Sequence, residues 1–178
     1  MKIIKTKFKD LVVIQKKTHA DNRGYFRELF IEKELNIKFT FDAMSFSKKN
    51  VIRGLHLQTK KPQGKMITVI KGSIFDVAVD CRSKSKTFGK YFSMILSEKS
   101  NISLYIPEGF AHGICSLEND TILHYKCTNY RDPKSETGIY WNDPKLKIKW
   151  PVKKPIVSDK DSINQTMNLS KLKKYLKW

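Results

Sequence analysis

Residues 73–82 read Ser-Ile-Phe-Asp-Val-Ala-Val-Asp-Cys-Arg, and this stretch decides the fold class. Every second side chain from Phe75 to Cys81 is apolar, which is the period of a β-strand that buries one face. The same alternation returns at 102–106 and 122–127. These segments therefore predict short strands with one face in the core.

Turn residues separate the strands, for example around Gly72 and Gly109. Many short strands with frequent turns are typical of a sandwich or barrel. Helix signals are confined to Glu32–Leu35 and Leu169–Leu176, near the two ends. We therefore predict an all-β fold, a jelly-roll barrel with short terminal helices, and a single domain over residues 1–178, because no linker or repeat divides the chain.

The chain has 178 residues, of which 40% are hydrophobic, enough for a core of its own. It contains no apolar run long enough to span a bilayer and no signal peptide, so we expect a cytoplasmic protein with no membrane partner. The three cysteines, Cys81, Cys115 and Cys127, are widely spaced, and we expect buried free thiols.

The formal net charge of +18 favours anionic partners, such as nucleic acid, a membrane surface or phosphorylated metabolites. Much of this excess is lysine spread along the whole chain, as in Lys48-Lys49 and Lys153-Lys154. Dispersed lysine is usually a solvated surface. The charge alone therefore selects no function.

The stretch 51–58 carries a histidine inside a predicted strand. Taken alone, a histidine between two leucines is more often a satisfied core residue than a reactive one. Strict alternation assigns its side chains to two faces, with Arg53, Leu55 and Leu57 on one and Gly54, His56 and Gln58 on the other.

Other polar residues have ordinary structural interpretations when each is taken singly. His112 follows a glycine-flanked turn, where a histidine commonly bonds to backbone, and Lys65 begins a strand, where a surface lysine is usual. Tyr125 shares a face with two apolar residues, so it points inward, and Asp161 is placed to cap a turn. The chain has no His-x-His pair, so we expect no metal site.

Several longer motifs nevertheless occur in order along nearly the whole chain. They lie at 21–26, 53–56, 62–65, 72–82, 87–90, 106–113, 125–126, 141–144, 150–151 and 158–161. On these motifs the chain resembles the dTDP-4-dehydrorhamnose 3,5-epimerase family. The resemblance implies a cupin-type jelly roll, a homodimer, no metal and no cofactor.

The resemblance also implies a role for each matching position. His56 matches the family's catalytic base, Asp161 the carboxylate that orients it, Tyr125 the acid on the opposite face of the sugar, and Lys65 the cation beside the enolate oxygen. The expected ligand is a nucleotide-diphosphate sugar. Its binding residues are expected to be Arg23, Glu28, Arg53, Gln58, His112, Tyr130 and Arg131.

These residue types suit the implied reaction, which inverts C3, C5 or both in a 4-keto-6-deoxy sugar. The ketone at C4 acidifies the neighbouring hydrogens, and a histidine has the near-neutral pKa that a base needs. A lysine can stabilise the enolate oxygen, and an arginine fork fits diphosphate oxygens. Two departures leave the nucleotide and the inverted centre open, because Phe41-Asp42-Ala43-Met44 replaces a Gln-Asp-Asn-His stretch and Tyr130-Arg131 replaces two tyrosines.

Three alternatives compete with this interpretation. A 3,4-ketoisomerase on the same barrel would also enolise the sugar, but its product would carry the ketone at C3. A non-catalytic sugar-nucleotide-binding protein would not need His56, Lys65, Tyr125 and Asp161 together. A nucleic-acid-binding domain would interleave basic and aromatic residues on an exposed face, which the sequence does not do, so we expect no nucleic-acid partner.

Overall fold

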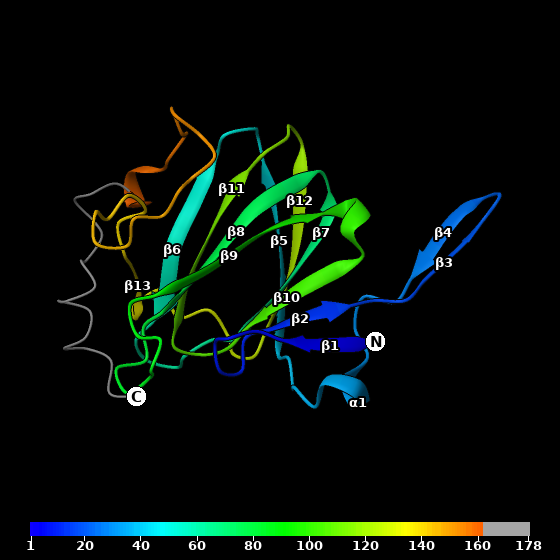
Figure 1. Cartoon of the computed structure of the whole chain (residues 1–178), viewed down its shortest axis with the longest axis horizontal. Coiled ribbons are helices and arrows are strands. Elements are labelled where there is room, and N and C mark those ends of the chain that lie inside the picture. Colours follow the sequence, from blue (N-terminus) through cyan, green and yellow to red (C-terminus); the bar gives the residue numbers. More distant parts are fainter. Residues whose placement is uncertain (162–178) are drawn as a thin grey trace.

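The computed structural model describes residues 1–161, and two antiparallel sheets in it face each other as a jelly-roll barrel (Figure 1). The predicted all-β class is confirmed. The six-stranded sheet contains, in spatial order, β1 (Lys2–Lys5), β2 (Val12–Gln15), β10 (Ile102–Ile106), β7 (Lys65–Lys71), β12 (Thr121–Cys127) and β5 (Phe41–Ser47). The five-stranded sheet contains β13 (Glu136–Gly138), β6 (Ile52–Gln58), β11 (Phe110–Ser116), β8 (Ser73–Asp80) and β9 (Tyr91–Ser97).

Smaller elements lie outside the two sheets. The hairpin of β3 (Thr18–Asp21) and β4 (Gly24–Arg27) projects away from the barrel (Figure 1). The predicted helix at Glu32–Leu35 is confirmed as α1, and 3₁₀ turns span Glu98–Ser100 and Asp159–Asp161. The predicted helix at Leu169–Leu176 lies outside the described residues. Within residues 1–161 no helix is long and apolar enough to cross a membrane.

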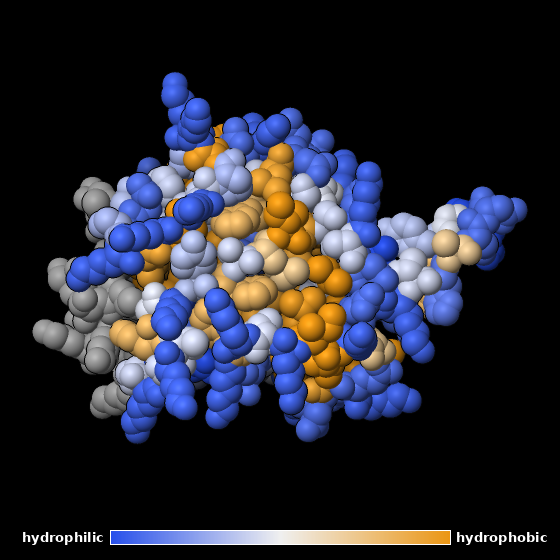
Figure 2. Space-filling view, in the orientation of Figure 1, coloured by the Kyte–Doolittle hydropathy of each residue, from blue (hydrophilic) through white to orange (hydrophobic). Residues whose placement is uncertain are grey.

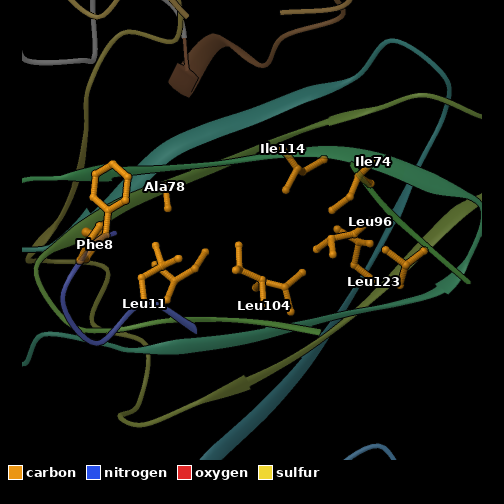
Figure 3. Packing of buried hydrophobic residues seen from close by; sticks show 12 residues of the cluster. Phe8, Leu11, Ile74, Ala78, Leu96, Leu104, Ile114 and Leu123 are labelled. Carbon is orange, nitrogen blue, oxygen red and sulfur yellow. The ribbon is translucent and has the colours of Figure 1, made fainter. Parts of the chain in front are cut away.

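The main core fills the space between the two sheets, as the close view in Figure 3 shows. Leu104 and Leu123 contribute from the six-stranded sheet, and Ile74, Ala78 and Ile114 from the five-stranded one. Side chains on facing strands interdigitate in this way because successive residues of a strand point to opposite faces. The alternation seen in the sequence therefore marks the faces that meet.

The prediction that each strand buries only one face is wrong for β8. Its second face, with Val77, Val79 and neighbouring side chains, belongs to another buried cluster that Leu146 and Ile139 cover. The chain after β13 thus adds a layer outside the five-stranded sheet. A strand that is covered on both sides has no face exposed to water, so it does not need a polar face. Asp76 and Asp80 nevertheless occur on β8, where both are buried.

One face of the molecule carries both hydrophilic and apolar side chains. Figure 2 shows long hydrophilic side chains around the rim of one face and an apolar patch near its centre. Cys81, Cys115 and Cys127 are buried free thiols, which confirms that expectation.

A glycine at position 54 is required by a close approach between β6 and β11. Its φ is +119°, and a Cβ there would lie 2.6 Å from Gly113 Cα and 2.6 Å from the His112 carbonyl oxygen. Both obstacles are backbone atoms, so no side-chain rotation relieves the clash. We expect Gly54→Ala to lower the free energy of unfolding by about 3–5 kcal/mol, measured by urea denaturation.

Gly24 provides the matched control, because its φ is +133° but nothing lies within 4 Å of the position of its Cβ. Gly24→Ala tests the strained backbone alone and should cost about 1–3 kcal/mol. Equal losses of unfolding free energy in the two variants would show that the clash with β11 adds nothing to the cost of Gly54→Ala.

Candidate active site

A cleft of about 480 Å³ opens between the two sheets near one end of the barrel. The five-stranded sheet contributes His56 and His112, and the six-stranded sheet contributes Lys65 and Tyr125. Asp161 closes the cleft from the 3₁₀ turn at Asp159–Asp161. All four expected catalytic residues therefore line one cavity, although His56 and Asp161 are 105 positions apart in the chain.

His56 and Asp161 form a direct side-chain pair, with His56 Nε2 against Asp161 Oδ1. The other carboxylate oxygen of Asp161 accepts a hydrogen bond of 3.0 Å from the backbone N–H of Gly54, two residues from His56 on the same strand. Asp161 is 3% exposed. Both oxygens of the carboxylate are thus used to fix the imidazole relative to β6.

The pKa of Asp161 lies below its ordinary value. Burial acts to raise this pKa, but the hydrogen bond and charge of His56 and the Gly54 N–H outweigh it. Asp161 is therefore ionised at neutral pH, and an ionised carboxylate only accepts hydrogen bonds. The proton of the imidazole lies on Nε2, which leaves the Nδ1 lone pair of His56 available to take a proton.

Lys65 and Tyr125 come from neighbouring strands, β7 and β12, and line the same cavity as His56. Burial lowers the pKa of Lys65 below its usual value. Burial also raises the pKa of Tyr125 to about 12, while Ser45, whose Oγ lies 3.1 Å from Tyr125 Oη, acts in the opposite direction. Tyr125 is therefore protonated at neutral pH and points inward, as predicted.

Arg53 lies in the cleft beside His56, so the predicted division of β6 into two faces is wrong at this residue. His56 pairs with His112 across the sheet, whereas Arg53 pairs with Ile114, so two positions on β11 correspond to three on β6. This register shift turns Arg53 to the face of His56. Its guanidinium donates to Ser47 Oγ at 3.0 Å and to the Phe46 carbonyl at 2.9 Å.

His112 is not a turn residue bonded to backbone, contrary to the interpretation of its local sequence. It lies inside β11, is 6% exposed and bonds through Nε2 to Asp76 Oδ2 at 3.0 Å. The turn residues end before Phe110, and the strand starts earlier than the glycines suggest. The second oxygen of Asp76 is buried without a hydrogen-bond partner among the described residues.

Sequence reasoning missed Glu136 and Lys160 and did not recognise Ser45. Glu136 lies at the cleft wall, where it bonds Lys160 and accepts from Arg131 Nε at 3.0 Å. Burial raises the pKa of Glu136, but the two cations outweigh burial and hold it below its usual value. No local pattern marks Glu136, whereas Lys160 lies within the motif at 158–161.

Gln58 lines a smaller pocket of about 190 Å³ that shares His56, Lys65 and Tyr125 with the cleft, but its amide is already used. Its nitrogen donates to the carbonyls of Lys61 and Tyr130, at 2.7 and 3.2 Å, and its oxygen accepts from the N–H of Asp132 at 2.8 Å. Gln58 therefore holds the loop after β12 in place. That loop carries Arg131 into the cleft.

Three expected binding residues line neither the cleft nor the smaller pocket beside it. Arg23 lies at the tip of the projecting hairpin, paired with Asp21 at 2.7 Å, and Glu28 follows that hairpin. Tyr130 is 63% exposed beside Arg131 and points to solvent. The hairpin leaves the barrel altogether, which local sequence patterns do not predict.

The departures at Phe41 and Ala43 fall on the smaller pocket beside the cleft. Phe41 and Ala43 line this pocket together with Leu57 and Cys127. In the register of β12 with β5, Ala43 lies opposite Tyr125 and Phe41 opposite Cys127. The substitutions are therefore adjacent to the reacting groups.

The family model for dTDP-4-dehydrorhamnose 3,5-epimerase matches residues 5–168 of the chain. The chain belongs to this epimerase family. The dTDP-4-dehydrorhamnose 3,5-epimerase of Methanothermobacter thermautotrophicus is 42% identical over 168 residues, which are 90% of this chain and 91% of the relative. The resemblance inferred from the motifs is confirmed.

Solved structures of the epimerase family have the same fold. The dTDP-6-deoxy-D-glucose-3,5-epimerase of Legionella pneumophila, solved in complex with dTDP-4-keto-L-rhamnose, superposes with a TM-score of 0.89 at 41% identity, covering 95% of this chain and 93% of that one. A 3′-monoepimerase from Streptomyces bikiniensis, in complex with dTDP-quinovose, has a TM-score of 0.87 at 26% identity, covering 94% and 87%. The cupin-type jelly roll is therefore the fold of this epimerase.

Proposed function

We propose that the chain inverts carbon centres beside the ketone of a dTDP-linked 4-keto-6-deoxy sugar, at C3 and C5. The observation that carries the proposal is the placement of a base and an acid on opposite walls of one cleft. His56 belongs to the five-stranded sheet and Tyr125 to the six-stranded sheet. A planar enolate held between them can lose a proton on one side and gain one on the other.

The first step is removal of the hydrogen at C3 or C5 by His56 Nδ1. The C–H bond breaks, its electron pair moves into the ring as an enolate, and the negative charge collects on the C4 oxygen. Asp161 stabilises the imidazolium that forms, since its carboxylate already faces Nε2. Asp161 thus acts through His56 and does not need to touch the sugar.

The enolate oxygen needs a cation, and Lys65 is the cation on the wall that carries Tyr125. Burial has removed much of the water that would otherwise screen this charge, so its interaction with an oxyanion is strengthened. The same burial makes a bare ammonium unfavourable before the substrate binds. An anionic ligand therefore stabilises the charged form of Lys65 and is itself stabilised by that charge.

The second step is protonation of the enolate carbon by Tyr125 Oη from the opposite side. The new C–H bond restores the ketone with inverted configuration, the tyrosinate takes a proton from solvent, and the His56 imidazolium releases its proton to solvent. Ser45 donates toward Tyr125 Oη when the phenol has lost its proton, because their oxygens lie 3.1 Å apart. Atoms and charges balance, with no net oxidation and no co-reactant.

The diphosphate of the ligand is expected at the cationic end of the cleft. Arg53, His112 and Lys160 all line the cleft. Arg53 is held by Ser47 and Phe46, so its free N–H groups are oriented before a ligand arrives. The sugar then extends from this end toward His56 and Lys65.

Deuterium exchange tests the reaction. In deuterium oxide, wild-type protein should introduce deuterium at both C3 and C5 of dTDP-4-keto-6-deoxyglucose, followed by NMR. Tyr125→Phe should retain exchange at the carbons that His56 reaches, yet lose most net inversion, because the opposite donor is absent. Wild-type protein that exchanges neither hydrogen would contradict the proposal and favour a protein that only binds the sugar nucleotide.

A single-centre epimerase is the second candidate. The observation that favours it is the apolar wall formed by Phe41 and Ala43 beside Tyr125. The related 3′-monoepimerase shows that one barrel supports either outcome. Exchange at C3 alone in the same experiment identifies this case. A product with its ketone at C3 would instead identify a ketoisomerase.

We also propose a homodimer in which the β3–β4 hairpin of one copy reaches the cleft of the other. Within one copy the expected diphosphate ligand Arg23 is exposed and distant from the cleft, and the hairpin presents Tyr25 and Phe26 to solvent at 61% and 67% exposure. A second copy would bury these rings. Sedimentation at a mass of one chain, with full activity, would contradict the dimer.

A further inference from the structure

A second hollow of about 430 Å³ shares no lining residue with the cleft. It lies between the connection from β8 to β9 and the connection from β1 to β2. Among the residues that the structure describes, no carboxylate belongs to its lining. Five cationic side chains line it, namely Lys7, Lys9, Arg82, Lys84 and Lys86.

The first wall of the hollow is a loop that alternates cations with hydroxyls, from Arg82 to Thr87. The hydroxyls of Ser85 and Thr87 both donate to the buried carboxylate of Asp80, each at 2.6 Å. Arg82 donates to the same carboxylate at 2.8 and 2.9 Å. Because the hydroxyls are turned inward, the lysines between them, Lys84 and Lys86, are exposed on the outer side.

The opposite wall is anchored by the core. Phe8 is 1% exposed, and its burial fixes the backbone of Lys7 and Lys9 on either side of it. Thr6 Oγ1 closes the same turn by donating to the Leu11 carbonyl at 2.8 Å. Arg82 Nη1 also donates to the Lys9 carbonyl at 3.1 Å, so the two walls are joined directly.

Arg82 is paired with Asp80 at 2.8 Å and approached by Asp10 at 3.8 Å, but the four lysines of the hollow are not neutralised. Within residues 1–161, none of these lysines has a carboxylate within ion-pair distance. The repulsion between exposed lysines is ordinarily screened by water, so it has little effect on stability. These cations instead surround one hollow on two anchored walls, where their mutual repulsion favours an anion of several charges.

We propose that this basic hollow, the one lined by Lys7, Lys9, Arg82, Lys84 and Lys86, binds a condensed phosphate chain. Such a chain spreads several negative charges over linked phosphates and can face both walls at once, which a single carboxylate cannot do. It can be inorganic or part of a nucleotide. The site is additional to the proposed epimerase reaction and does not depend on it.

Calorimetric titration with inorganic tripolyphosphate at about 0.15 M salt tests the site. The double variant Lys84→Gln/Lys86→Gln should bind the probe at this hollow roughly tenfold more weakly, since two exposed charge pairs are lost. Arg53→Gln changes only the cleft and should leave this binding event intact. Loss of tripolyphosphate binding in Arg53→Gln together with full binding in the lysine variant would overturn the proposal.

The matched control is Lys153→Gln/Lys154→Gln, which removes the same charge from an exposed segment outside the hollow. If it weakens binding as much as the Lys84/Lys86 variant, the attraction comes from net charge and the proposal is wrong. A second titration with dTTP distinguishes the sources. For the binding event that the Lys84/Lys86 variant weakens, equal affinity for dTTP and tripolyphosphate assigns the inorganic chain, and tighter dTTP binding assigns a nucleotide.

Discussion

His56→Ala is expected to lose deuterium exchange at every carbon that the wild-type protein labels, with a fall in kcat of roughly 10²–10⁴-fold. The variant removes the Nδ1 lone pair of the more accessible imidazole of the five-stranded sheet. His112 is the less accessible one, because its side chain is 6% exposed against 26% for His56. Single-turnover NMR in deuterium oxide measures the exchange directly.

His124→Ala is the control for this result. His124 lies on β12 and bonds Asp42 at 3.1 Å, away from the cleft lining, so its loss should leave exchange unchanged. A His56→Ala variant that folds, binds dTDP and still exchanges at the wild-type rate would show that another group is the base. Asp161→Asn should give a smaller loss, since it disturbs the tautomer of His56 but leaves the ring in place.

Lys65→Met should lower kcat by about 10²–10³-fold while KM changes little, because the cation acts mainly on charge that develops at the C4 oxygen. The apolar side chain has a similar length, and burial already disfavours the charged form of Lys65. The variant should therefore fold at least as stably as the wild type. Steady-state kinetics and thermal unfolding of the same preparation separate the two effects.

Lys71→Met controls for the loss of one charge from the same strand. Lys71 ends β7 and only approaches Asp120, at 3.9 Å on the surface. Its replacement should change neither kcat nor stability measurably. A Lys65→Met loss that appears in KM and not in kcat would instead mean that Lys65 binds the ground-state ligand.

Period-two alternation was sufficient to predict the sheets, because side-chain direction in a strand depends only on position. It correctly turned Tyr125 inward and placed Leu55 in the cluster outside the five-stranded sheet, away from the pocket of His56. It failed at Arg53, where a register shift between β6 and β11 reverses the facing of the chain. Such a shift depends on the partner strand, and a single strand's sequence does not contain that information.

The candidate site was predictable only where motifs carried the resemblance. His56, Lys65, Tyr125 and Asp161 converge as expected. Glu136 was missed because its place in the cleft depends on the pairing of β13 with β6, which brings together residues far apart in the chain. Long-range pairing of this kind leaves no periodic signal.

The hydrophobic core has a consequence for how this enzyme can evolve. His56 and Tyr125 stand on separate sheets, and the side chains packed between those sheets set the gap across which a proton is delivered. The volumes of core side chains such as Leu104 and Leu123 thus fix the distance between the two catalytic groups, and catalysis tolerates a change of only a fraction of an ångström in that distance. A change of volume in the core can therefore lower turnover while the melting temperature hardly changes. Selection on catalysis thus acts also on residues that never contact the substrate.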